Sequence, residues 1–364
     1  MHLVSLAVTD FRNLAETDIE LDPEGTTVIT GPNGAGKTSL LEATAYLATL
    51  ESFRGSPKEA LVRRGTKGAI LRAHTVVADR SLTIEAEVLT TGRSRTQVNR
   101  QVVRRRADLH EALRVTVFSP EDIGMVRAGP SDRRRFLDET LAVVDPKAAR
   151  SAEEVEKVLR QRAALLRTSG SALQADTATT LDVWDARLDD AGTRLVESRE
   201  LLVDQLAPLA GEHYSRLAGT STDVGLTYVR SWSGRLLDAL AGARTKDIQR
   251  GISTVGPHRD ELELTLNGLP SRTHASQGEQ RSLALALQLA AHQLATERLG
   301  TAPVLLLDDV FSELDPRRSR ALLAGLPPGQ AMLTTAQPAP PEVAAAKVYA
   351  MDAGGHVAAS RGRS

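Results

Sequence analysis

The sequence predicts an α/β fold in which a mixed sheet is covered by helices and interrupted by an inserted α-helical hairpin arm. Three observations lead to this prediction. A buried strand pattern at residues 26–30, TTVIT, runs directly into a glycine-rich turn and a helix rich in alanine and leucine. A second continuous apolar strand covers residues 304–307. Between the two lie long stretches rich in Ala, Leu, Glu and Arg, which are typical of helices.

Shorter strands are predicted on both sides of the helical stretches. The runs LVSLAVTDF and TDIELD alternate apolar and polar residues, as half-buried strands do. Further strands before the helical stretches are predicted over residues 70–78, 82–90 and 115–118. After them we expect a strand in ELELTLNG, a helix over about residues 277–298, and the strands 304–307 and 331–335.

The helical stretches, residues 131–167 and 180–218, predict two antiparallel helices joined by the polar turn RTSGSALQADTATT. In the second stretch a leucine recurs every seven positions, which indicates a short heptad seam of Leu181, Leu188, Leu195 and Leu202. The pair is either an arm on the rest of the chain or a helical subdomain packed flat against it. The predicted domains are therefore residues 1–119 and 251–364, as two halves of one head, and residues 120–250 as the arm.

The composition is that of an ordinary globular protein. The 364 residues are 41% hydrophobic and 25% charged, with a formal net charge of -1. The absence of cysteine excludes disulfides, thiolate metal sites and cysteine nucleophiles, and it fits a reducing cytoplasm. No apolar run approaches the roughly 20 residues that span a bilayer. Polar residues within MHLVSLAVTDFRN indicate a strand rather than a signal peptide, so we expect a cytoplasmic protein without a membrane partner.

Positive charge is concentrated in one segment of the chain. Residues 51–135 contain 18 Lys and Arg against 10 Asp and Glu, a net charge of 18 - 10 = +8 that leaves -9 for the remainder. Most of it comes from Arg93, Arg95, Arg100, Arg104, Arg105, Arg106, Arg133, Arg134 and Arg135. Such a segment either neutralises the phosphates of a nucleic acid or forms a solvated surface balanced by neighbouring acids.

Residues 31–38, GPNGAGKT, fit the phosphate-binding loop pattern, in which Gly and four residues precede Gly-Lys-Ser/Thr. The loop lies between a predicted strand and a predicted helix, which is the context that the pattern requires. Its glycines let backbone N–H groups converge on phosphate oxygens, and the helix N-terminus adds a favourable dipole. Lys37 is then expected to bridge the β- and γ-phosphates and Thr38 to bind magnesium. The alternative is a glycine-rich turn without a ligand.

The run APVLLLDDVFSELDP places two carboxylates at the end of a buried strand, where open α/β sheets bind ligands. Asp308 is expected to hold the magnesium ion through its water shell, and Asp309 to orient or deprotonate the attacking water. A lone metal site or a loop cap is the alternative. Together with the phosphate loop, the two carboxylates predict nucleotide hydrolysis.

The run HASQGEQRSL, residues 274–283, contains a second helix start that is suited to an anion. Because the chain has one phosphate loop, the simplest explanation is that Ser276 and Gly278 contact the γ-phosphate of a nucleotide held by a second copy of the chain. This requires a head-to-tail pair with twofold symmetry. The alternative is an ordinary helix cap, in which Ser276 and Glu279 form a capping box.

In their order along the chain, these motifs resemble those of ATP-binding-cassette (ABC) ATPases. The phosphate loop, SQGEQ, the Asp-Asp strand and the SELD after it look like Walker A, signature, Walker B and D-loop motifs. More narrowly, the chain resembles the RecF family of bacterial replication and repair proteins, in the runs FRNL, SFRG, FSPEDIGMVRAGPSDRRRFLD, TVGPHRDEL and LLLDDVFSELD. The 239 positions from Lys37 to Ser276 exceed the helical insert of transporter cassettes and fall far short of SMC coiled coils.

The resemblance implies an ABC-type ATPase head and an ATP-dependent DNA-binding protein that dimerises with ATP, hydrolyses it slowly and dissociates. The implied cofactors are ATP and Mg²⁺. The implied partners are single- and double-stranded DNA at gaps, RecO and RecR, and through them RecA. The implied site residues are Asp309, Lys37 and Ser276 for catalysis, Thr38 and Asp308 for the metal, and, for nucleotide contacts, Arg12, Asn13, Gly31, Pro32, Asn33, Gly34, Ala35, Gly36, Lys37, Thr38, Ser39, Ser276 and Gly278.

Three features depart from the general cassette pattern. Asp309 stands where cassettes have a glutamate, so its carboxylate is one methylene shorter. Thr334 and Thr335 end the AMLTT strand, and no switch histidine follows it. Residues 115–118 contain no glutamine for a Q-loop. Two other functions share the motifs: a transporter-coupled nucleotide-binding subunit, and a nucleotide-gated scaffold in which hydrolysis is incidental.

Overall fold

The computed structural model describes residues 1–104, 107–168, 175–326, 328–337, 343 and 345–359. By their contacts the residues form two compact units. Unit 1 comprises Met1–Asp122, Arg216–Gly219 and Gln288–Ser364, and unit 2 comprises Ile123–Ser215 and Thr220–Leu287. This division differs from the predicted domains mainly in residues 251–287, which join the unit that holds the long helices. The predicted polar turn between those helices falls largely outside the described residues.

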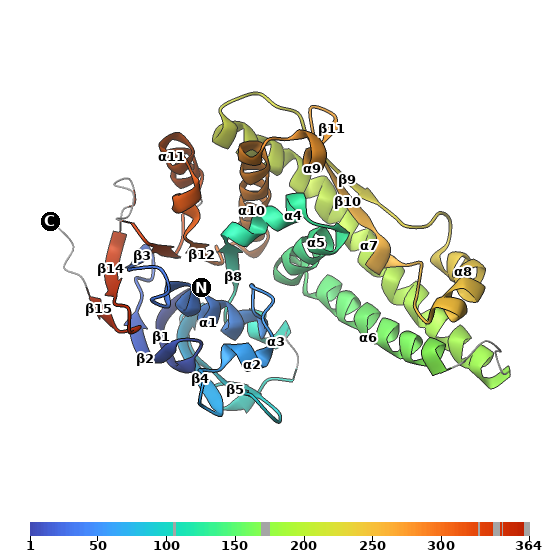
Figure 1. The fold of residues 1–364 in the computed structure, drawn as a ribbon, viewed down its shortest axis with the longest axis horizontal. Coiled ribbons are helices and arrows are strands. Elements are labelled where there is room, and N and C mark those ends of the chain that lie inside the picture. Colours follow the sequence, from blue (N-terminus) through green and yellow to red (C-terminus); the bar gives the residue numbers. More distant parts are fainter. Residues whose placement is uncertain (105–106, 169–174, 327, 338–342, 344, 360–364) are drawn as a thin grey trace. The chain divides into compact units, whose positions relative to one another are not determined.

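The first sheet of unit 1 contains the predicted buried strands. Its order is β15-β14-β3-β13-β12-β8, and every neighbouring pair is parallel except β14 with β15. The strands are β3 (Thr26–Thr30), β8 (Val115–Phe118), β12 (Val304–Asp308), β13 (Ala331–Thr335), β14 (Ala345–Met351) and β15 (Val357–Ala359). Parallel strands place their carboxyl ends at one edge, so the ends of β3, β13, β12 and β8 meet there (Figure 1).

The second sheet of unit 1 is antiparallel, with the order β2-β1-β4-β5-β6-β7. Its strands are β1 (His2–Phe11), β2 (Leu14–Glu20), β4 (Gly68–Val77), β5 (Arg80–Leu89), β6 (Arg95–Val98) and β7 (Gln101–Val102). Burial alternates along β4, where Ala69, Leu71 and Ala73 are buried and their neighbours are exposed. One face of this sheet is therefore covered and the other is open to solvent.

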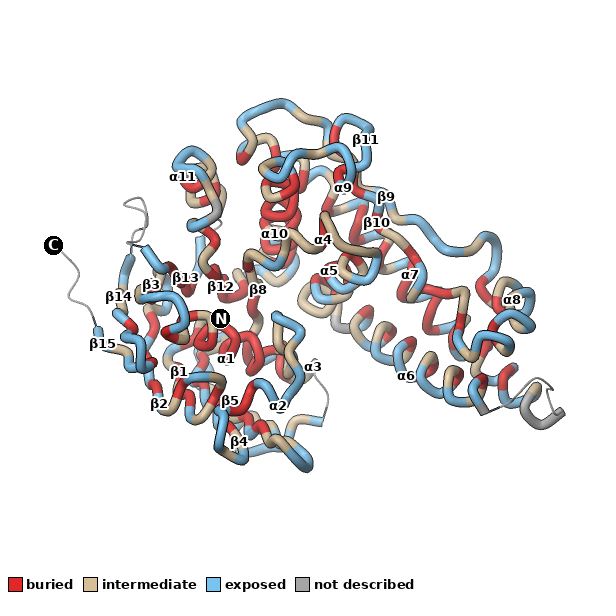
Figure 2. The backbone as a smooth tube through the Cα atoms, viewed as in Figure 1, coloured by how far each residue is buried: buried red, intermediate tan, exposed pale blue. Residues whose placement is uncertain are grey.

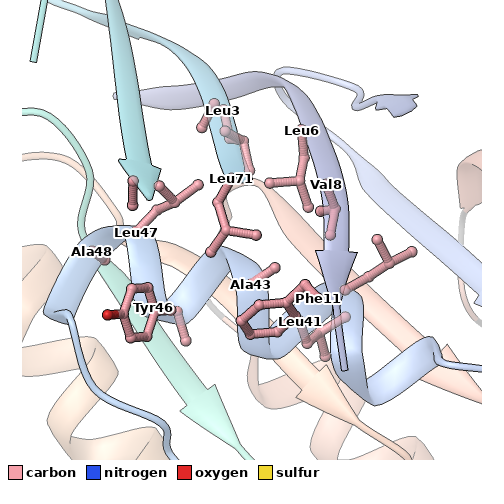
Figure 3. Close-up of a cluster of buried hydrophobic side chains, with 14 of the residues drawn as sticks. Leu3, Leu6, Val8, Phe11, Leu41, Ala43, Tyr46, Leu47, Ala48 and Leu71 are labelled. Atoms are coloured by element: carbon pink, nitrogen blue, oxygen red, sulfur yellow. The ribbon is translucent and has the colours of Figure 1, made fainter. Parts of the chain in front are cut away.

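Helix α1 (Lys37–Thr49) lies between the two sheets of unit 1, in contact with β1 and β4 of one and with β12 and β13 of the other. It is buried along almost its whole length, as Figure 2 shows. Because both sides of the helix face a sheet, it needs small and apolar residues all round, which accounts for its Ala- and Leu-rich sequence. Figure 3 shows Leu41, Ala43, Tyr46 and Leu47 of α1 beside Leu6, Val8, Phe11 and Leu71 of the antiparallel sheet.

The short elements of unit 1 are α2 (Lys58–Leu61), α3 (Ala107–His110), the 3-10 turns Pro120–Ile123 and Val310–Glu313, and α11 (Pro316–Gly325). Helix α11 begins at Pro316, directly after the SELD run. The Asp315 side chain accepts a hydrogen bond from the Arg318 N–H and so caps this helix.

Unit 2 contains the predicted helical stretches, as α4 (Gly124–Arg127), α5 (Pro130–Val144), α6 (Pro146–Thr168), α7 (Ala175–Ala218, whose last turn belongs to unit 1) and α8 (Leu236–Arg250). The stretch 131–167 is two helices rather than one. Asp145 is extended, and Pro146 has no N–H to continue α5 but fits the first turn of α6. Helices α6 and α7 run side by side (Figure 1), and the leucines of the heptad seam, Leu181, Leu188, Leu195 and Leu202, are all buried.

A buried ionic cluster joins three helices of unit 2. Arg162 on α6 is fully buried; its Nε donates to Asp185 on α7 over 2.7 Å, and one terminal nitrogen donates to Asp247 on α8, also over 2.7 Å. Arg244 on α8 donates to the second oxygen of Asp185 over 2.7 Å. Ser253 accepts a further hydrogen bond from Arg162 over 2.8 Å. The cluster fixes α6, α7 and α8 to one another.

The rest of unit 2 is a small antiparallel sheet and the start of the last long helix. The sheet has the order β11-β10-β9, with β9 (Val224–Val229), β10 (Glu261–Leu266) and β11 (Leu269–Pro270). The 3-10 turn Pro257–Arg259 precedes β10, and the one-turn helix α9 (Ser271–His274) leads into α10 (Gln277–Leu299), which starts within SQGEQ as predicted. Within the described ranges, no helix combines the length and apolarity required to cross a membrane.

Candidate nucleotide site

The glycine-rich turn connects β3 to α1, as the sequence predicts. Gly34 has φ 81, and a Cβ there would meet no atom within 4 Å, so its backbone is open on that side. Gly36 has φ 115, and a Cβ there would lie 2.6 Å from Leu14 Cδ2 and 2.9 Å from Asn13 Nδ2. Gly34 thus supplies an open left-handed turn, and Gly36 allows Asn13 and Leu14 to approach the loop.

Lys37 closes the glycine-rich turn from within. Its Nζ donates to the carbonyl oxygens of Gly31 over 2.8 Å and Pro32 over 2.9 Å. Burial lowers the pKa of the Lys37 ammonium, and the negative charges of Asp309 and Asp308 oppose that effect. The Lys37 ammonium therefore lies against two carbonyls of the loop and within electrostatic range of both carboxylates.

Asp308 and Thr38 lie together at the carboxyl end of the parallel sheet. The Thr38 hydroxyl donates to Asp308 Oδ1 over 2.8 Å, and the Thr334 hydroxyl donates to the same oxygen over 2.7 Å. Burial raises the pKa of Asp308, the two hydroxyls oppose the rise, and Glu121 and Asp309 add to it through their negative charge. The two residues predicted to bind the metal are thus in direct contact.

The Asp308 carboxylate and the Thr38 hydroxyl fit a magnesium ion whose coordination is completed by phosphate and water. Among the described residues no group of three or more His, Cys, Asp or Glu side chains could hold a metal. Mg²⁺ is typically held by one or two carboxylates together with substrate phosphates and water, which matches one carboxylate and one hydroxyl here. Asp309 Oδ1 is buried and finds no hydrogen-bond partner among the residues that the structure describes, so this carboxylate has an open acceptor. Its backbone is left-handed, with φ 47.

Asn13 supports the phosphate loop from outside. Its Nδ2 donates to the carbonyl oxygens of Gly34 and Ala35, both over 3.0 Å, and its Oδ1 accepts from the Ser39 hydroxyl over 2.9 Å. Asn13 and Ser39, both predicted to contact nucleotide, are therefore paired with each other. The Asn13 amide thereby ties the phosphate loop to the FRNL run, which turns between β1 and β2.

Arg12, also predicted to contact nucleotide, is bound to protein groups instead. Its guanidinium pairs with both oxygens of Glu42, a fully buried carboxylate of α1, over 2.6 and 2.7 Å. It also donates to Ser56 Oγ over 2.6 Å and to the carbonyl of Ala60 over 2.9 Å. In this structure Arg12 holds α1 and the segment after it in place.

Ser276 forms the capping box that the sequence offered as an alternative. Its N–H and its hydroxyl both donate to Glu279 Oε2 over 2.7 Å, and the Glu279 N–H donates back to Ser276 Oγ over 3.4 Å. Ser276 is exposed at the start of α10, and it belongs to unit 2, whereas the phosphate loop belongs to unit 1. Two donors of this residue thus already converge on one anionic oxygen.

Comparison with known proteins identifies the family. The model of the RecF/RecN/SMC N terminal domain matches residues 2–333. The DNA replication and repair protein RecF of Streptomyces avermitilis is 41% identical over 350 residues, which cover 92% of this chain and 93% of that protein. RecF of Beutenbergia cavernae is 39% identical over 98% of this chain and 99% of its own.

The chain belongs to the RecF family. A solved structure described as the recombination mediator protein RecF-ATP in the RecFOR pathway matches it with a TM-score of 0.90, at 28% identity, over 99% of this chain and 98% of the other. The Smc head domain of Pyrococcus furiosus with an extended coiled coil shares the fold, with a TM-score of 0.58 at 15% identity. The predicted ABC-type ATPase head is confirmed by these matches.

Thr334 and the SFRG run stand out in the sequence, but the contacts that they make in this RecF-family site were not predicted. Thr334 donates to the Asp308 carboxylate and also accepts a hydrogen bond from the Asp309 N–H over 3.0 Å, so it holds the carboxylate of Asp308 and the backbone of Asp309. The SFRG run contributes Ser52, whose hydroxyl donates to Glu42 over 2.5 Å, and Arg54, which lies 3.8 Å from Glu121. The signal for Thr334 was its place at the end of a buried strand, because β13 pairs in parallel with β12 and sets Thr334 beside Asp308.

Gln280, the last residue of the SQGEQ run, is structural in this RecF-family chain. It is buried, and its amide donates to the carbonyl oxygens of Ser271 and Arg272, both over 3.1 Å, while its oxygen accepts from Arg127 Nε over 2.6 Å. It thereby fastens α4 and α9 to the first turn of α10. In the sequence, the only indication of this role is that Gln280 is a polar residue at a position of α10 where an apolar residue is expected.

Proposed function

We propose that this RecF-family chain is an ATP-dependent DNA-binding protein of recombinational repair and replication restart, active in the cytoplasm. ATP binding joins two copies, slow hydrolysis separates them, and the dimer binds single- and double-stranded DNA at gaps and assists RecA loading with RecO and RecR. The observation that carries the ATPase part is the cluster of Lys37, Thr38, Asp308 and the unpartnered Asp309 at the carboxyl edge of one parallel sheet. The match to a RecF-ATP structure supports ATP as the nucleotide.

The proposed roles follow from the chemistry of each group. Residues 31–36 present backbone N–H groups to the phosphates, and Lys37 exchanges the carbonyls of Gly31 and Pro32 for phosphate oxygens. Thr38 and Asp308 hold Mg²⁺, which when bound supplies positive charge against the phosphate oxygens. To bind the metal, Thr38 must offer a lone pair of its hydroxyl oxygen. Asp308 must be ionised, although its burial raises its pKa.

Asp309 is the group that we assign to the attacking water. Its buried Oδ1 has no hydrogen-bond partner, so a water placed there satisfies a group that is otherwise costly to bury. The Thr334 hydroxyl and carbonyl both accept from the Asp309 N–H, over 3.0 and 3.2 Å, and hold its backbone. Because the aspartate side chain is one methylene shorter than the usual glutamate, the water is held less closely and we expect slow turnover.

Ser276 and Gly278 are proposed to contact the γ-phosphate of the partner copy. The support is local: the Ser276 N–H and hydroxyl already converge on a carboxylate oxygen of Glu279, at the positive end of α10. A phosphate oxygen would replace that carboxylate oxygen with the same two donors. This assignment also gives the RecF-family chain a reason to dimerise only when ATP is bound.

The Asp309→Asn variant tests the proposed catalysis. It keeps the shape of the side chain but removes the base, so ATP binding and dimerisation are retained while the rate of ATP hydrolysis falls by about 10²–10⁴-fold. Phosphate release under single-turnover conditions measures this rate. Unchanged hydrolysis contradicts the assignment of Asp309. If the variant lacks hydrolysis yet supports DNA repair in cells as well as the native chain, the protein is a nucleotide-gated scaffold instead.

A further inference from the structure

The structure separates the arginines of the positive segment into two groups. Those at its end are bound to protein. Arg133 is buried and pairs with both oxygens of Glu261 over 2.7 and 2.8 Å. Arg134 donates to the carbonyl of Asp260 over 2.6 Å, and Arg135 donates to Asp132 over 2.9 Å. Arg133 and Arg134 thus tie α5 to the start of β10, whereas Arg135 is exposed and pairs with a carboxylate of its own helix.

The second group lies at the edge of the antiparallel sheet of unit 1. Residues 88–107 contain six arginines and no Asp or Glu. Arg93 lies in the turn between β5 and β6, Arg100 in the turn between β6 and β7, and Arg104 just after β7. All three are exposed, and in the described part of the chain none of them has an ion pair or a side-chain hydrogen bond. We call β6, β7 and these three residues the arginine hairpin.

The backbone at the tip of the arginine hairpin is left-handed at an arginine, where glycine is usual. Val98 pairs with Gln101, so the turn consists of Asn99 and Arg100, and both are left-handed, with φ 48 and φ 65. Two-residue turns of this type favour glycine at the second position, because a side chain there is strained. Arginine at this position costs backbone energy that glycine avoids, and what it adds is an exposed guanidinium at the tip.

The tip is also held rigidly on the sheet. The Asn99 N–H donates to the carbonyl of Thr83 over 2.8 Å, and the Thr83 N–H donates to Asn99 Oδ1 over 2.8 Å. The Val103 N–H donates to the carbonyl of Thr96 over 2.9 Å. A tip fixed in this way loses little conformational entropy when its side chains bind a ligand.

We propose that the arginine hairpin binds the phosphate backbone of duplex DNA, with Arg93, Arg100 and Arg104 each neutralising a phosphate. This inference rests on the proposed DNA-binding function and assigns a surface to it. Every positive residue within 88–107 is arginine and none is lysine, and the planar guanidinium binds phosphate oxygens with two hydrogen bonds. The segment itself contains no carboxylate that would repel DNA, and the exposed Glu87 of the neighbouring strand β5 lies opposite Arg95 rather than opposite Arg93, Arg100 or Arg104.

Charged residues that flank an edge strand can also serve a simpler purpose, and the experiment must distinguish it from phosphate binding. Strand β7 is the edge of its sheet, and charges on an edge prevent pairing with other chains. Glutamate serves that purpose as well as arginine does. A phosphate contact requires the positive sign, so the sign of the charge distinguishes the two roles.

The test measures the affinity of the full chain with ATP and Mg²⁺ for a blunt duplex oligonucleotide, over a series of salt concentrations. In the triple variant Arg93→Gln, Arg100→Gln, Arg104→Gln, the slope of log affinity against log salt falls by about 2.7, or about 0.9 for each phosphate contact. The affinity falls on the order of 10²-fold at ~0.15 M salt. The matched control replaces the exposed arginines Arg160, Arg194 and Arg298 with Gln and keeps the native slope.

A second variant, Arg93→Glu, Arg100→Glu, Arg104→Glu, keeps the edge charged. We expect it to remain monodisperse without nucleotide, to bind a fluorescent ATP analogue normally, and to lose duplex binding further than the Gln variant. An unchanged salt slope in the Gln variant, or an equal loss in the control, overturns the hairpin assignment while the native chain still binds DNA. If the native chain itself fails to bind the duplex with ATP, the proposed DNA-binding function is overturned, and this inference with it.

Discussion

At the scale of single residues, the main feature of the nucleotide site is the buried carboxylate of Asp308. Asp308 is buried at a strand end, and in the described part of the chain its carboxylate accepts from two hydroxyls, those of Thr38 and Thr334. Its raised pKa means that the folded chain without metal disfavours the ionised form. A group with a raised folded pKa destabilises the fold once the pH exceeds its unfolded pKa, so at neutral pH the ionised Asp308 costs stability.

The Asp308→Asn variant is therefore expected to stabilise the chain in the absence of nucleotide, by roughly 0.5–2 kcal/mol. The neutral amide removes the buried charge but keeps a hydrogen-bond acceptor for the two hydroxyls. Thermal unfolding with and without Mg²⁺ and ATP measures the effect. The same variant should lose the additional stabilisation that Mg²⁺ with ATP gives the native chain. A lower melting temperature without nucleotide, or undiminished stabilisation by Mg²⁺ with ATP, contradicts this account.

Residue types in the site could be predicted from the sequence, but their partners could not. The spacing GPNGAGKT and the Asp-Asp pair have a local chemical meaning, so Lys37, Thr38 and Asp308 were found. The Thr334 contact depends on the register of β12 with β13, which is a tertiary property. Arg12 was expected near nucleotide because of its turn, yet its guanidinium is bound by Glu42, which comes from the interior of α1. Sequence spacing gave no indication of that pair.

At the scale of elements, the most informative structure is the ionic cluster that joins α6, α7 and α8. Helical periodicity predicts that a charged residue such as Arg162 lies on the solvent side of an amphipathic helix. It is instead fully buried, because carboxylates from two other helices meet it there. The predicted strands and helix lie close to β1–β5, β8, β10, β12, β13 and α10. Strands β6, β7, β9, β11, β14 and β15 were not predicted, and the break at Pro146 divided one predicted helix into two.

The Arg162→Leu variant is expected to destabilise unit 2 by about 3–5 kcal/mol, because it leaves Asp185 and Asp247 buried with fewer partners. Arg160→Leu on the exposed side of the same helix is the matched control and should change stability by less than about 0.5 kcal/mol. Denaturant unfolding followed by circular dichroism measures both. Equal effects of the two substitutions would show that the cluster does not hold the helices together.

At the scale of the whole molecule, the proposed ATPase cycle needs a second copy of the chain. One chain has one phosphate loop, and the helix start at Ser276, which we propose to bind phosphate, forms a capping box with Glu279 within the single chain. We propose that the RecF-family motifs, the Asp309 carboxylate and the arginine hairpin act in one cycle. In the proposed cycle ATP joins two copies, DNA binds to the pair, and hydrolysis separates them.

The central claim is that ATP joins two copies through Ser276, and sedimentation velocity with and without ATP and Mg²⁺ tests it most directly. The native chain should sediment as a monomer without nucleotide and as a dimer with ATP. Ser276→Arg should remain a monomer while it binds ATP with native affinity, and Glu279→Ala, which breaks the same capping box without adding bulk, should still dimerise. A native chain that stays monomeric with ATP bound, or a Ser276→Arg chain that dimerises normally, contradicts the account.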